Sequence, residues 1–220
     1  AGAVAMWRVP SQPIPRSRHH VHPMGAMCLM REDRMFGYLC IMQMMLGLGN
    51  LATIPLRTEF LASPERGMGL SAGLVLILTI AVPEAGRLIS TLIWGRLFDR
   101  LNFIVLRLSI NVIFAASIVL FFIPNMNCII LGSALFGIAM GGGKIAWSLW
   151  VTKFATPDKT ADYMAVHTFL TGARGIVGPQ LSYAALAVMT VPQVGWIGTS
   201  LVLLSCVMLA FVLPKQTDRT

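Results

Sequence analysis

The chain has 220 residues, of which 56% are hydrophobic and 12% are charged, and its mean hydropathy is +0.74. Soluble domains carry about 25% charged residues, so the composition excludes a soluble globular protein, and its apolar content excludes a disordered one. The net charge of +8 indicates basic loops beside a membrane rather than a nucleic-acid partner. We therefore expect an all-α integral membrane protein, and at about 20 residues a span the length allows about six transmembrane helices.

The first 34 residues differ from the rest of the chain. They are rich in proline and basic residues, so residues 1–34 are expected to form a cytoplasmic linker or tail near anionic headgroups. His19, His20 and His22 are potential metal ligands, but no fourth ligand accompanies them. The sequence therefore predicts neither a metal site nor a cofactor.

Six apolar segments follow, and polar turns separate them. Together they are expected to form a six-helix bundle over residues 35–214, with a cytoplasmic tail at 215–220. The uncharged stretch from Leu108 to Gly143 is too long for one span, so it is expected to fold back at Pro124–Asn127. The predicted spans cover residues 35–56, 73–94, 103–123, 128–151, 163–189 and 194–213.

Basic residues gather on one side of this arrangement. Twelve of them precede the first span, lie in or beside the second and fourth loops, or follow the last span, and Arg107 is counted beside the second loop. The opposite side has two, Arg57 and Arg66, both assigned to the first loop. Because cytoplasmic loops collect lysine and arginine, both termini are expected in the cytoplasm, with the bundle in the plasma (inner) membrane.

A short charged turn joins the second and third predicted spans. Gly95 is expected to let two helices approach closely, Asp99 to cap a helix or pair with a basic residue, and Asn102 to enter the left-handed region. The turn resembles the G-x-L-x-D-R-x-G signature of the major facilitator superfamily, with Gly95, Leu97, Asp99 and Arg100 at matching positions. Asn102 stands where the final glycine would be, and the basic pair usual after it is replaced by apolar residues.

The resemblance covers about residues 35–213. It implies that the chain is one six-helix half of a twelve-span transporter, in which this turn helps to latch the cytoplasmic side as two halves rock. The basic stretch before the first span looks like the linker between halves. The chain therefore resembles a C-terminal half, and a missing N-terminal six-helix half is expected as its partner.

Apart from Arg107, which is counted beside the second loop, four charged residues lie inside predicted spans, where each costs about 2.5–3.5 kcal/mol at a helix centre. Glu84 and Arg87 are three residues apart and can pair on one helix face. Lys144 and Arg174 have no obvious acidic partner. Either carboxylates of the missing half or an anionic solute could balance them, and the sequence leaves both alternatives open.

Glycines surround the two unpaired cations. The run Gly141–Gly143 before Lys144, and the glycines near Arg174 with Pro179, are expected to break their helices, as at the substrate sites of transporters. The spacing of Gly137 and Gly141 predicts close contact with another helix.

Further polar and aromatic residues complete the candidates. His167 could relay protons or simply bond to a neighbouring backbone group. Gln43 and Asn50 share one helix face and could line a cavity or bond across helices. Trp147 and Trp150 are predicted to be anchors at the membrane interface.

These features predict a secondary active transporter that carries a small organic solute by alternating access. The excess of positive charge inside the spans favours an anionic solute. The alternatives are a non-transporting membrane subunit or receptor and a membrane-embedded enzyme. The enzyme is disfavoured because no catalytic constellation lies in the spans. The expected partners are the solute, the lipid bilayer and the second half.

Overall fold

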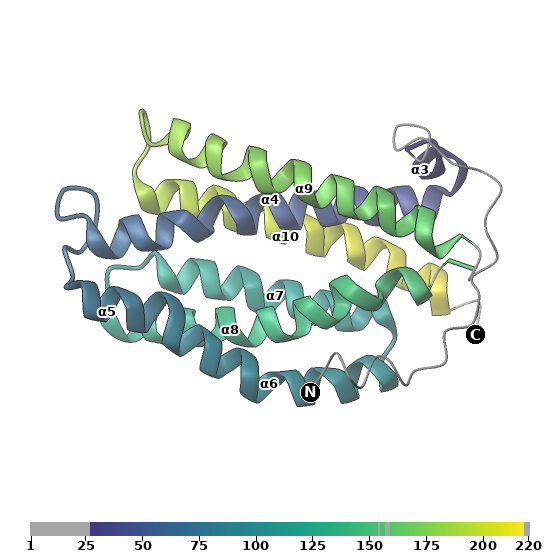
Figure 1. Cartoon of the computed structure of the whole chain (residues 1–220), viewed down its shortest axis with the longest axis horizontal. Helices are drawn as coiled ribbons and strands as arrows, with labels where there is room; N and C mark the ends of the chain where they lie inside the picture. The colour runs from purple at the N-terminus through teal and green to yellow at the C-terminus, as the bar shows by residue number, and fades with distance from the viewer. Residues whose placement is uncertain (1–26, 154, 157–158, 218–220) are drawn as a thin grey trace, which may run out of the picture.

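The computed structural model describes residues 27–153, 155–156 and 159–217, in which every regular element is a helix. A short helix, α3 (Leu29–Glu32), precedes a set of long helices that run side by side (Figure 1). The three histidines of the N-terminal segment lie outside the described residues. Four of the long elements are single helices: α4 (Arg34–Ala62), α7 (Phe103–Phe121), α9 (Thr160–Ala185) and α10 (Val191–Thr217). A fifth is a continuous segment made of α5 (Ala72–Leu76), the π turn η1 (Ile77–Ala81) and α6 (Val82–Arg100). The last is α8 (Met126–Leu149), which the 3-10 turn η2 (Trp150–Lys153) continues.

The helices pack in an order different from their order in the chain. From one edge to the other the neighbours are α9, α4, α10, α7, α8 and α6 (Figure 1). The bundle thus consists of one group of α4, α9 and α10 and a second group of α6, α7 and α8, which meet mainly where α10 packs on α7.

Among the described residues, five helical segments are long and apolar enough to cross a membrane, which indicates a membrane protein. They are α4, the continuous segment Ala72–Arg100, α7, α8 and the first 22 residues of α10. Large apolar side chains are exposed on the outside of the bundle, as expected for surface that faces lipid. The fifth predicted span, residues 163–189, corresponds to α9, which has 26 residues but is not among the five.

The prediction that the glycine run and Pro179 break their helices is wrong. α8 is continuous through Gly141–Gly143, and α9 is continuous through Pro179. Packing keeps the glycine run helical, since Gly141 faces Ser90 and Gly142 faces Trp94. The irregularity lies instead in η1, just before Pro83, whose ring nitrogen cannot donate a hydrogen bond to the preceding turn.

Glycine contacts bring α6 and α8 together, as the spacing of Gly137 and Gly141 predicts. A Cβ at Gly137 would overlap the backbone carbonyl of Pro83, and one at Gly86 would lie 2.9 Å from the carbonyl oxygen of Ala134. Beside this contact the indole Nε1 of Trp94 donates to the carbonyl of Ile138 at 2.8 Å. The two backbones therefore touch directly, with side-chain hydrogen bonds alongside.

Candidate functional site: a basic cavity between the two helix groups

A cavity of about 280 Å³ opens between the two helix groups. Its walls come from α4 and α9 on one side and from α7 and α8 on the other. Three basic side chains line it, and no acidic residue does so among the residues that the structure describes. The lining residues that carry the argument are Gly47, Asn50, Arg107, Lys144, Trp147 and Arg174.

Arg174 reaches from α9 across to α4. Its side chain is 8% exposed, and its Nη1 donates a hydrogen bond to the backbone carbonyl of Gln43. The guanidinium lies directly over Gly47, where any Cβ would overlap it. Its Nε has no hydrogen-bond partner in the described part of the chain. Gly47 thus provides the space that lets this cation lie in the bundle.

Lys144 lies on the cavity side of α8 and is exposed. It also borders a second hollow of about 340 Å³, which contains Glu84 and Arg87. Those two form the expected ion pair, with Arg87 Nε 2.9 Å from Glu84 Oε2. The structure therefore brings all four predicted intramembrane charges to two adjoining hollows that share Lys144.

Gln43 and Asn50 were each expected to line a cavity or to bond across helices, and each residue fulfils a different one of these alternatives. Gln43 is buried and bonds across helices, because its Oε1 accepts from Arg107 Nη2 at 3.5 Å. Asn50 lines the cavity, and its Oδ1 is buried without a hydrogen-bond partner within the described structure. Gln43 is therefore a support that holds Arg107 and Arg174, whereas Asn50 offers a polar atom to the cavity.

Two arginines that were counted in or beside loops are buried within helices. Arg107 is 4% exposed within α7 and lines the cavity. Arg57 is 4% exposed within α4, and its guanidinium lies over the rings of Phe121 and Phe136, at 4.6 and 3.9 Å from their centroids. Arg57 also donates to Ser117 Oγ at 3.4 Å. Cation–π contacts inside the bundle therefore stabilise the Arg57 guanidinium, which does not lie in a polar loop.

Trp147 and Trp150 both pack against His167 inside the bundle. Trp150 is fully buried and stacks on Phe36, and Trp147 lines the cavity, where its Nε1 donates to Thr171 Oγ1 at 3.4 Å. Trp150 is therefore a core residue and not an interface anchor. His167 is buried between the two indoles, with ring centroids 5.4 and 5.2 Å away, and does not line the cavity.

The turn that resembles the major facilitator signature joins the end of α6 to the start of α7. Asn102 is not left-handed: its φ is −56°, and its side chain caps α7 by accepting from the Ile104 N–H at 2.8 Å. A Cβ at Gly95 would meet nothing within 4 Å, so this glycine makes no close contact inside the described bundle. Leu97 packs partly buried against the core, and Asp99 and Arg100 are exposed.

Chemically, the cavity can hold an anion. Guanidinium and ammonium groups from three helices surround it, and such groups bind carboxylates and phosphates through charge-assisted hydrogen bonds. No group of three or more His, Cys, Asp or Glu that could hold a metal occurs within the described ranges.

Comparisons with models of known protein families, with curated proteins and with solved structures found no match to this chain.

Proposed function

We propose that the chain is one half of a secondary active transporter of the major facilitator type, which carries a small organic anion by alternating access. The bundle would lie in the plasma membrane with the α3 end in the cytoplasm, and a second six-helix body would complete the pathway. In this proposal α9 also crosses the membrane, as the fifth of six spans. The resemblance of the turn at Gly95–Arg100 supports the family, and the cavity supports the solute class.

The observation that carries the proposal is the cavity lined by Arg107, Lys144 and Arg174. Charged groups in a membrane are expensive, and they are retained where they face a pathway or bind a partner. Here they converge from three helices on one hollow between the two helix groups. An anionic solute would offset their repulsion and would contact both helix groups of this bundle at once.

Solute flux in proteoliposomes tests this proposal. The protein encoded by the native message would be reconstituted and offered radiolabelled monocarboxylates, dicarboxylates and organophosphates, with neutral and cationic solutes of similar size. We expect saturable uptake of at least one anion. Arg174→Ala and Lys144→Ala should each lower that uptake about tenfold or more, because each removes a charge-assisted contact.

Lys159→Ala is the matched control, since Lys159 is exposed just before α9 and does not line the cavity. It should transport like wild type. Uptake that is unchanged in both cavity variants would refute the site, and absence of flux for every solute would refute the transporter.

A further inference from the structure

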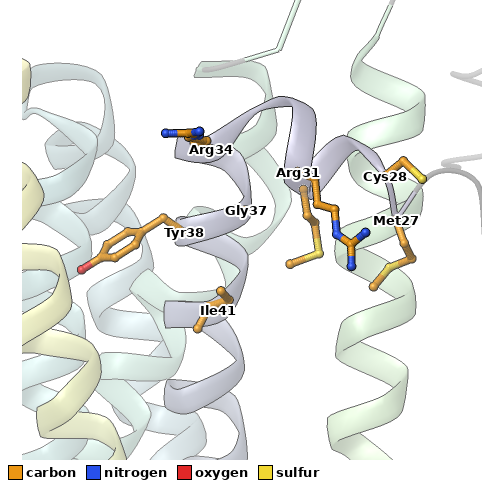
Figure 2. Close-up of a pocket in the computed structure, with 8 residues that line it drawn as sticks. Met27, Cys28, Arg31, Arg34, Gly37, Tyr38 and Ile41 are labelled. Carbon is orange, nitrogen blue, oxygen red and sulfur yellow. The ribbon is translucent and has the colours of Figure 1, made fainter.

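A separate hollow of about 640 Å³ lies where α3 joins α4 (Figure 2). This junction is at one end of the bundle (Figure 1). It is distinct from the central cavity and shares no lining residue with it. Its walls combine arginines with methionine, tyrosine and isoleucine side chains, as Figure 2 shows. A site that presents both charge and apolar surface favours an amphiphilic ligand.

The shape of this hollow is built into the junction. α3 packs tightly on α4 because Gly37 has no side chain, and a Cβ there would overlap the backbone carbonyl of Met30. Tyr38, one residue later, is held by a hydrogen bond of 2.9 Å from its hydroxyl to the carbonyl of Met208 on α10. The backbone of α3 and the ring of Tyr38 are therefore fixed walls.

The charge of the hollow is positive and lacks a counter-charge. Arg31 and Arg34 both line it and are exposed, and neither forms a salt bridge with a carboxylate in the described chain. The nearby Asp33 is committed elsewhere: its Oδ1 caps α4 at Met35 and Phe36, and its Oδ2 accepts from the hydroxyl of Tyr163. Glu32 is exposed and does not line the hollow.

The two kinds of surface are arranged along the helix axis. Arg34 is the first residue of α4, and Ile41 lies seven residues further on, about 10 Å deeper at 1.5 Å for each residue. Ile41 is 47% exposed and lines the same hollow. Because α4 is long and apolar enough to cross the membrane, the basic end would lie at headgroup level and the apolar end beside acyl chains.

From this arrangement we propose that the α3–α4 junction is a binding site for an anionic phospholipid. The phosphate contacts Arg31 and Arg34, and an acyl chain lies along Met30, Tyr38 and Ile41. Arginine clusters immediately before a transmembrane helix attract anionic headgroups, and guanidinium suits phosphate geometry. A bound lipid would tie the segment before the first span to the membrane surface. This site does not depend on the transport proposal.

Lipid retention by the purified full chain tests the proposal. The protein would be exchanged from detergent into nanodiscs that contain phosphatidylglycerol and phosphatidylcholine in equal amounts, and co-purified lipids would be counted by native mass spectrometry. We expect an excess of phosphatidylglycerol. Arg31→Gln combined with Arg34→Gln should reduce that excess by about fivefold for each arginine removed.

The matched control is Arg96→Gln combined with Arg100→Gln, which removes the same charge from exposed positions near the end of α6. It should keep the excess. Equal loss in both double variants would show that general surface charge attracts the lipid, and no loss in either would also overturn the site. A second arm adds glycerol phosphate as competitor: if it displaces the lipid completely at millimolar concentration, the site binds phosphate alone and the acyl chain contributes nothing.

Discussion

Gly137→Ala is expected to lower the free energy of unfolding by about 3 kcal/mol or more, the largest stability effect that we predict. A methyl group there would overlap the backbone carbonyl of Pro83, which cannot rotate aside as a side chain can. Overpacked cores typically lose about 1–3 kcal/mol, and a backbone obstacle belongs at the upper end. Equilibrium unfolding in detergent micelles, followed by circular dichroism, measures the change.

Gly95→Ala provides the control, because it makes the same chemical change in α6, at a glycine whose Cβ would meet nothing within 4 Å. Alanine favours the helix over glycine by about 1 kcal/mol, so this variant should be as stable as wild type or slightly more so. If both variants unfold alike, α6 and α8 are not in backbone contact at Gly137.

Gly47→Ala is expected to displace Arg174 and to lower the free energy of unfolding by about 1–3 kcal/mol. The new methyl group would occupy the place of the Arg174 side chain, so the bond to the Gln43 carbonyl would be lost. Gly172→Ala on α9 is the matched variant, since nothing lies within 4 Å of its Cβ, and it should not destabilise the protein.

A double-mutant cycle isolates this contact. With Arg174→Ala already present, Gly47→Ala should cost nothing further, because the space above Gly47 is then empty. The same detergent unfolding assay measures all four proteins. A cost for Gly47→Ala that stays unchanged without the Arg174 side chain would show that the glycine serves something other than this arginine.

Hydropathy is enough to predict where most helices lie. Long uncharged runs predict α7, α8 and α10 within a few residues, because membrane thickness sets the length of each span. The turn at Pro124–Asn127 also lies as expected, and Asn125 caps α8 by accepting from the N–H of Asn127 and Cys128. Hydropathy does not predict the order in which the helices pack, because contacts between distant helices depend on side chains that share no local spacing.

The central cavity could be predicted only in part. Lys144 and Arg174 stand out as charges within apolar runs, and the structure brings both to one hollow. Arg107 lines the cavity, and Arg57 is buried elsewhere in the bundle. Hydropathy predicts neither position, because both arginines lie near the ends of their apolar runs. A signal did exist for Arg57: it follows Gln43 and Asn50 at the same seven-residue interval, which places all three on one face of α4.

Helix continuity was mispredicted because propensity is a weak guide within a packed bundle. Glycine costs about 1 kcal/mol in a helix interior, but Gly137 and Gly141 offset this cost because they allow close contact between α8 and α6. The π turn before Pro83 follows from a missing N–H, a local effect that the sequence does show.

The most direct test of the central claim, that this bundle is one half of a transporter, is to read the native message upstream of Ala1 to its initiator methionine. We predict six further apolar spans, with a second G-x-L-x-D-R turn between their second and third members. An initiator immediately before Ala1 would contradict the claim, since a single six-helix bundle would then have to enclose any pathway with another copy or another protein.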